Sequence, residues 1–176
     1  MNRIILLVCV IVLGSTIIGC KSDGTSGQSK KAKEYKEPSP AMTALRDRAK
    51  SVYDFRMKNT EFSTAQILDN GVWEYKFTFA EGAMSKLGEL TGKWIDFEDN
   101  NTYEYGLYGD VKGSGIYHYD PLTTIALLID DDPSVKPQEF EMKIVMDALV
   151  MVGQKTYNDN GTQSKLDKRD VRPTKG

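Results

Sequence analysis

Apolar and polar residues alternate along much of this chain, which is the pattern of strands with one buried face. In the first such run Trp73, Tyr75, Phe77 and Phe79 alternate with polar residues, as expected for a strand on the surface of a sheet. Turn residues separate the runs at intervals of about 8–12 residues, which is typical of antiparallel all-β domains. The runs lie near residues 71–80, 92–98, 102–108, 113–119, 123–130, 138–146, 148–157 and 162–169. The sequence therefore predicts an all-β domain over residues 62–170, an antiparallel up-and-down barrel of about eight strands.

The side chains expected to point into this barrel are bulky. An eight-stranded barrel is just wide enough to be filled by its own side chains or to hold one small ligand. We therefore expect a narrow cavity confined to one end, with weak affinity for long apolar probes. The predicted inward set is Trp73, Tyr75, Phe77, Phe79, Ile95, Phe97, Tyr103, Tyr105, Leu107, Ile125, Leu127, Ile129, Phe140, Met142, Ile144 and Met146.

One amphipathic helix is expected before the barrel, within residues 41–61. Ser39 and Pro40 form a helix start, with an N-cap followed by proline at the first helical position. The spacing predicts a helix that packs on the outside or end of the domain; a lid or partner-binding helix is the alternative. Residues 80–91 predict a connecting helix or lid-like loop, and residues 171–176 a frayed tail. The apolar positions of the helix are Met42, Leu45, Ala49, Val52, Phe55 and Met57.

The N-terminus has the form of a secretion signal. A basic residue, Arg3, precedes an apolar run that is too short to span a bilayer. The following Ile17-Ile18-Gly19-Cys20 resembles the lipobox of bacterial lipoproteins. This resemblance implies a signal peptide over residues 1–19 and acyl chains on Cys20, which would hold the protein at a membrane. A plain signal peptide followed by a coincidental cysteine is the alternative.

Composition and charge narrow the location. Lys21 stands after Cys20 where an aspartate would resemble an inner-membrane retention signal, so we expect the outer membrane of a two-membrane bacterium. Residues 20–40 are rich in Lys, Ser, Gly and Glu and predict a flexible tether. The whole chain has 23 Lys and Arg against 25 Asp and Glu, which gives no basic surface for nucleic acid.

The barrel region resembles a known family. Ile67-Leu68-x-x-Gly71-x-Trp73 is similar to the start of the lipocalin-like domains found in many bacterial lipoproteins. Residues 97–103 and 115–117 are similar to later strands of those domains. The resemblance implies a small barrel that binds apolar ligands or has no known ligand, with Trp73 plugging its closed end. Gly92-Lys93-Trp94 is a second copy of the pattern; we prefer the first copy because it leaves room for eight strands.

Four tyrosines are the candidate ligand-binding residues. Tyr103, Tyr105, Tyr117 and Tyr119 fall on two neighbouring predicted strands. Tyrosine has an apolar face and a polar tip, so this group could stack on a sugar or line a ligand mouth. Cross-strand aromatic packing that only stabilises the sheet is the alternative.

No pattern indicates catalysis, a cofactor or a metal. His118 is the single histidine, Asp130 to Asp132 lack the spacing of an EF-hand, and Ser114 lacks the helix and base of a nucleophile elbow. We expect a non-enzymatic envelope lipoprotein that binds a small apolar or glycan-like ligand. The alternative is a structural or protein-interaction module with a fully packed barrel.

Overall fold

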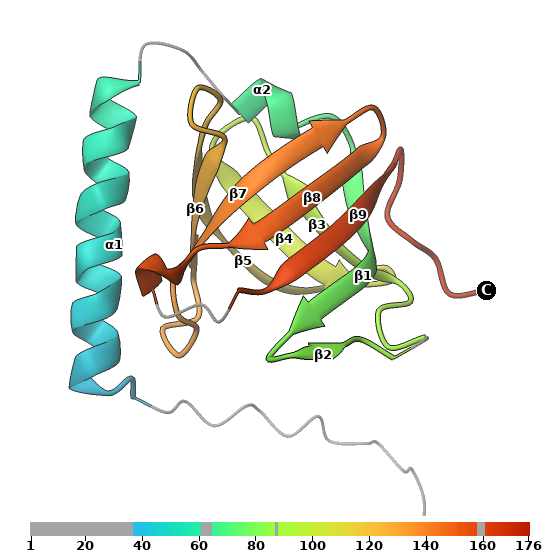
Figure 1. Cartoon of the computed structure of the whole chain (residues 1–176), viewed down its shortest axis with the longest axis horizontal. Helices are drawn as coiled ribbons and strands as arrows, with labels where there is room; N and C mark the ends of the chain where they lie inside the picture. Colours follow the sequence, from blue (N-terminus) through green and yellow to red (C-terminus); the bar gives the residue numbers. More distant parts are fainter. Residues whose placement is uncertain (1–36, 61–64, 87, 158–160) are drawn as a thin grey trace, which may run out of the picture. The chain divides into compact units, whose positions relative to one another are not determined.

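The computed structural model describes residues 37–60, 65–86, 88–157 and 161–176 (Figure 1). The predicted signal peptide, Cys20 and most of the predicted tether lie outside these residues. Among the helices of the described ranges, none has the length and apolar character needed to cross a bilayer.

The strands form one antiparallel sheet that closes on itself. Each long strand pairs with the next along the chain, and the last strand pairs with the first along its whole length. The prediction of an eight-stranded antiparallel barrel is therefore confirmed. The barrel strands are β1 (Val72–Ala80), β3 (Lys93–Phe97), β4 (Thr102–Leu107), β5 (Asp110–Asp120), β6 (Ile125–Asp130), β7 (Gln138–Val145), β8 (Ala148–Gly153) and β9 (Gln163–Arg169).

The segment after β1 contains a short strand where a connecting helix or lid-like loop was expected. The two-residue strand β2 (Ala83–Met84) pairs back onto the end of β1. Glu81 and Gly82 connect them, and both have positive φ, at 53° and 78°, as in the type I′ turn that matches the twist of a hairpin. No helix is assigned to the described part of residues 80–91.

A β-bulge changes the inward face of β1. Tyr75 pairs with Leu166 and Phe77 with Lys165, which leaves Lys76 as an extra residue. Beyond a bulge the alternation of faces is shifted by one. Thr78, opposite the buried Ser164, therefore lies on the interior face. The prediction that Phe77 and Phe79 point inward is wrong for this reason.

The inward face of β6 is also the reverse of the predicted one. Ala126 and Leu128 belong to the interior cluster, whereas Leu127 and Ile129 are buried on the outer face. Ile125 shares the outer face by alternation. Met146, also predicted to point inward, lies in the β7–β8 turn with φ of 51° and is 89 % exposed.

Helix α1 (Pro40–Asn59) covers the outer face that Leu127 and Ile129 form. Its start is as predicted, because the Ser39 side chain accepts a hydrogen bond from the Met42 backbone nitrogen. Ala49 is fully buried against these strands, which confirms packing on the outside of the barrel.

The apolar stripe of α1 differs from the predicted one near its end. Phe55 is 68 % exposed and Met57 is 38 % exposed. Leu45 and Val52 pack toward the barrel as predicted, and Tyr53 packs there in place of Phe55. The buried face therefore passes through Tyr53 and not through Phe55.

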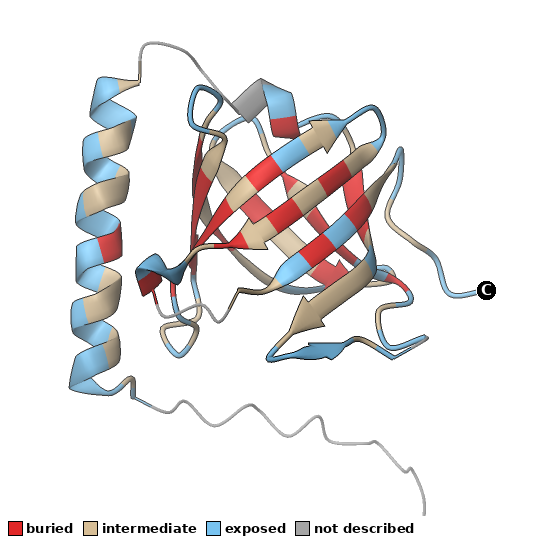
Figure 2. Ribbon diagram, in the orientation of Figure 1, coloured by how far each residue is buried: buried red, intermediate tan, exposed pale blue. Residues whose placement is uncertain are grey.

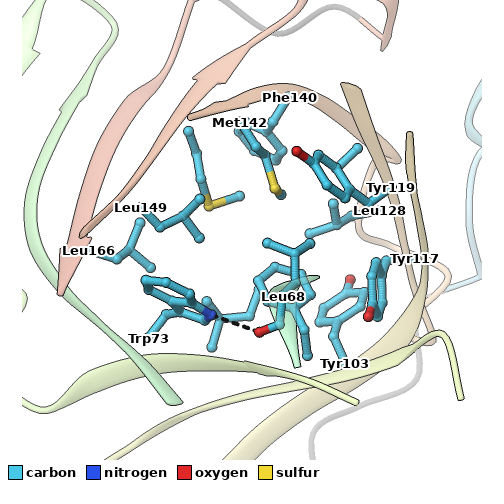
Figure 3. Close-up of a cluster of buried hydrophobic side chains, with 14 residues drawn as sticks. Leu68, Trp73, Tyr103, Tyr117, Tyr119, Leu128, Phe140, Met142, Leu149 and Leu166 are labelled. Atoms are coloured by element: carbon cyan, nitrogen blue, oxygen red, sulfur yellow. Dashed lines mark hydrogen bonds between the residues drawn. The ribbon is translucent and has the colours of Figure 1, made fainter. Parts of the chain in front are cut away.

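One end of the barrel is closed by the residues that precede β1. Helix α2 (Ala65–Leu68) places Leu68 in the interior, and the Trp73 indole nitrogen donates to the Leu68 carbonyl oxygen at 3.1 Å (Figure 3). Trp73 is 1 % exposed. The first strand begins at Val72, so the first of the two Gly-x-Trp copies is the one that opens the barrel.

The C-terminal tail is fixed to the outer surface at Arg172. This guanidinium lies 4.3 Å from the ring centroid of Trp94. It also pairs with Glu104 at 2.7 Å and Asp96 at 3.4 Å. The tail is thus held at this point, where a frayed end was expected. Figure 2 shows how buried positions alternate with more exposed ones along the barrel strands.

Candidate functional site: a cavity at the open end of the barrel

A cavity of about 590 Å³ occupies the barrel end opposite Trp73. Its lining comes from the end of β1, the start of β3, the end of β4 and the starts of β7 and β9. Ile95, Leu128, Phe140 and Met151 supply an apolar floor. The cavity is confined to one end, as the sequence predicts. Its volume falls within the range of about 300–1,000 Å³ that is typical of small-molecule sites.

Tyr103 and Tyr105 line this cavity, and glycines on the next strand make room for their rings. Tyr103 pairs with Gly115 and Tyr105 with Gly113. A Cβ atom at Gly115 would lie 2.7 Å from the Tyr103 ring, and one at Gly113 would collide with the Tyr105 phenol. The two tyrosine rings are stacked, with centroids 6.3 Å apart and planes at 25°. The Gly-x-Gly pattern around Ser114 therefore serves ring packing and not a nucleophile elbow.

The cavity tyrosines remain protonated at neutral pH. Burial raises the pKa of Tyr75 to about 12. Burial, followed by the interaction with the Asp130 carboxylate, raises the pKa of Tyr105 to about 12. The pKa of Tyr103 is raised as well, again mainly by burial. The phenols of Tyr75 and Tyr103 keep a proton that can be donated to a bound molecule, and the phenol of Tyr105 donates to Asp130.

Tyr117 and Tyr119 do not line the cavity. Tyr117 is fully buried in the packed interior (Figure 3). Its ring lies 4.9 Å from that of Phe97 in an edge-to-face arrangement, and its hydroxyl donates to the Glu98 carbonyl oxygen at 3.0 Å. Tyr119 is 5 % exposed in the same cluster. Of the four predicted ligand-binding tyrosines, the structure brings Tyr103 and Tyr105 to the cavity and places the other two in the core.

Asp130 is a cavity residue that the sequence interpretation missed. It shares the inward face of β6 with Ala126 and Leu128, and it is 4 % exposed. Its Oδ1 accepts a hydrogen bond from the Asp132 backbone nitrogen at 2.7 Å. Asp130 follows Ala126 and Leu128 at even spacing and so lies on the same face of the strand. The sequence does not show that this face points inward, because β6 is apolar on both faces.

The rest of the aspartate corner is structural. The Ser114 hydroxyl donates to Asp131 Oδ2 at 2.6 Å. Arg46 of α1 donates to the backbone carbonyl oxygens of Asp130, Asp132 and Val135, at 2.5, 3.1 and 2.7 Å. No cluster of His, Cys, Asp or Glu suited to a metal ion occurs within the described ranges.

Further polar groups surround the mouth of the cavity. The Thr78 and Ser164 hydroxyls lie 3.0 Å apart and both residues line the cavity, as does Gln138. Lys112 also contributes to the lining, and its ammonium pairs with Asp110 at 3.1 Å. The site thus combines an apolar floor with a small number of hydroxyl, amide and carboxylate groups.

His118 lies outside the cavity, beneath α1. The Thr60 hydroxyl donates to the Arg56 carbonyl oxygen at 2.7 Å, so it accepts from His118 Nε2, which lies 2.8 Å away. His118 Nδ1 is buried and has no hydrogen-bond partner among the described residues. Burial and then the charge of Arg56 lower the pKa of His118. His118 therefore has a structural role at the contact between α1 and the barrel.

Comparison with known proteins adds little to this geometry. The sequence matches no protein-family model and no curated protein. A similar solved structure is the crystal structure of a DUF4847 family protein from Bacteroides vulgatus. The two chains share 9 % identity over 60 % of this chain and 97 % of that one, with a TM-score of 0.44. The class of this protein, a small closed β-barrel with a cavity at one end, accordingly rests on its own structure.

Proposed function

We propose that this protein is a lipid-anchored envelope protein whose barrel binds a small, largely apolar ligand without converting it chemically. The observation that carries this proposal is the cavity of about 590 Å³ at the open end of the barrel. The apolar floor would take the body of a ligand, and the hydroxyls and carboxylate near the mouth would fix its orientation. The alternative of a fully packed barrel is disfavoured by the same cavity.

The location is proposed from the sequence. The Ile17-Ile18-Gly19-Cys20 pattern supports acylation of Cys20, and Lys21 supports placement at the outer membrane. Two or more acyl chains would hold the protein at the bilayer. The proposed role is non-enzymatic; His118, the single histidine of the chain, contacts Thr60 next to α1 and is not among the residues that line the cavity.

Calorimetric titration with a neutral aromatic alcohol tests this function. We would use the full-length protein in lipid nanodiscs, with empty nanodiscs as the blank, and indole-3-ethanol as the probe. Saturable one-to-one binding is expected. Ser164→Leu, which fills part of the cavity, should weaken it at least ten-fold.

Lys165→Leu is the matched control. It adds the same side chain one position along β9, on the outer face, where Lys165 is exposed. This variant should bind like the wild type. Absence of saturable binding by the wild type, or equal binding by Ser164→Leu, would contradict the proposed function.

A further inference from the structure

The carboxylate of Asp130 has no cationic partner within the part of the chain that the structure describes. Asp130 is 4 % exposed and lines the cavity. Its carboxylate contacts the Asp132 backbone N–H and the Tyr105 hydroxyl. Arg46 lies close by, but its guanidinium binds the backbone carbonyl of Asp130. A buried carboxylate is costly unless an opposite charge or several hydrogen bonds compensate it.

The structural contact of Asp130 does not need a negative charge. Its carboxylate accepts hydrogen bonds from the backbone nitrogen two residues on and from the Tyr105 hydroxyl. The amide oxygen of an asparagine side chain can accept such bonds without a charge. The negative charge is therefore in excess of what the turn requires. Its position, on the inward face beside the cavity, makes it available to a bound molecule.

The surrounding aromatic rings favour the same kind of ligand. Tyr75, Tyr103 and Tyr105 all line the cavity with Asp130. The face of an aromatic ring attracts cations, and this attraction is larger when the cation is removed from water. A carboxylate among tyrosine rings is a suitable environment for an ammonium group.

Lysines at the mouth do not reverse this preference. Lys112 is paired with Asp110, and both side chains are at least half exposed. Lys93 is exposed as well. Solvent screens exposed charges strongly, whereas the interaction with a buried carboxylate is screened much less.

We infer that the cavity binds a cationic amine carried on an apolar body, with the ammonium group against Asp130 and the tyrosine rings and the body on the apolar floor. This inference rests on the proposed function, because it names the chemical class of the ligand that the same cavity takes. Ligands of the same shape that carry a carboxylate are disfavoured, since their charge would meet that of Asp130.

Three probes of matched shape test the inference. Tryptamine, indole-3-ethanol and indole-3-acetate carry a cationic, a neutral and an anionic group on the same indole ring. We would titrate each at pH 7 into the full-length protein in nanodiscs, with empty nanodiscs as the blank. Tryptamine should bind at least ten-fold more tightly than the alcohol, and the acetate more weakly than the alcohol.

Asp130→Asn is the decisive variant, because it keeps the acceptor for the Asp132 N–H and removes the charge. It should bind tryptamine no better than it binds the alcohol. Asp131→Asn is the control, since it removes the same formal charge from the exposed neighbouring residue; its preference for tryptamine should persist. Should Asp130→Asn fail to fold, Tyr105→Leu removes an aromatic face and should reduce the ratio of tryptamine affinity to alcohol affinity; an unchanged ratio would contradict the inference.

The outcomes separate the two proposals. If the wild type binds the alcohol as tightly as tryptamine, or if Asp130→Asn keeps the preference, the inference is overturned and the binding function stands. If none of the three probes binds, the binding function fails together with it.

Discussion

The phenol ring of Tyr105 lies directly across Gly113 of the neighbouring strand, where a Cβ atom would collide with it. We expect Gly113→Ala to force this ring out of place and to destabilise the barrel by about 1–3 kcal/mol, as overpacking does elsewhere. Urea unfolding followed by tryptophan fluorescence measures the change. Gly109→Ala is the control, because nothing lies within 4 Å of a Cβ atom there. Equal stability of the two variants would contradict the proposed packing of Tyr105.

Trp73 and Phe77 should respond very differently to truncation. Trp73→Ala removes a fully buried side chain from the closed end and should cost about 3–5 kcal/mol. Phe77 lies on the outer face after the bulge and is only partly buried, so Phe77→Ala should cost about 1 kcal/mol. Chemical unfolding of both variants measures the difference. A larger loss for Phe77→Ala would mean that the alternation of β1 is not interrupted at Lys76.

The His118 pKa predicts a loss of stability in mild acid. Burial and Arg56 lower this pKa in the folded state, so the unfolded chain binds more protons as the pH falls below about 6.5. The unfolding free energy should therefore decrease as the pH falls from about 7 to about 5. The charged groups around the histidine are Arg56 of α1, Asp120 of β5 and Glu139 of β7, which pairs with Arg56 at 2.7 Å.

His118→Gln isolates the contribution of the histidine to this pH dependence. Because His118 is the single histidine of the chain, the carboxylates titrate in both proteins and cancel in the comparison. Stability measured at several pH values should fall less steeply for the variant than for the wild type. Parallel curves would show that His118 has the same pKa in the folded and unfolded states.

Arg172 shields Trp94 from solvent, and its removal should be visible in fluorescence. Arg172→Ala removes the stacked guanidinium and both ion pairs. We expect a red shift of the tryptophan emission and a loss of about 0.5–1 kcal/mol, because the side chain is partly exposed. Lys175→Ala, at an exposed tail position, should leave the spectrum unchanged. An unshifted spectrum for Arg172→Ala would place the tail away from Trp94.

Cys20 is the expected site of membrane attachment. Cys20→Ala should abolish incorporation of labelled fatty acid and shift the protein from the membrane to the soluble fraction. Fractionation of cells after metabolic labelling measures both. A variant that still carries lipid label and stays with the membrane would refute the lipoprotein prediction.

Strand positions could be predicted from the sequence because they depend on local patterns. Turn residues and alternating apolar residues located all eight barrel strands, with end points that differ by a few residues. Which face of a strand points into the barrel depends instead on contacts between residues far apart in the sequence. In β6, residues Ile125 to Ile129 are all apolar, so alternation does not distinguish the inner face from the outer face. The docking of α1 on Leu127 and Ile129 decides it.

The candidate site was predictable in part for a similar reason. Tyr103 and Tyr105 follow the alternation of β4 and were expected in the barrel. Asp130 was considered only together with Asp131 and Asp132, as part of a run of aspartates without the spacing of a metal site. Only the reversed facing of β6 reveals that its side chain enters the cavity. The bulge at Lys76, which brings Thr78 inward and turns Phe77 outward, has no comparable mark in the sequence.

The contacts of Arg46 have a consequence for the order in which the protein folds. They join α1 to carbonyl oxygens 84 to 89 positions further along the chain. Helix α1 is synthesised first, but the partners of Arg46 exist only after β6 and the loop behind it have been made. Contacts over such long separations form slowly, because much of the intervening chain must be ordered first. The mouth of the cavity is therefore expected to be among the last parts of the molecule to take shape.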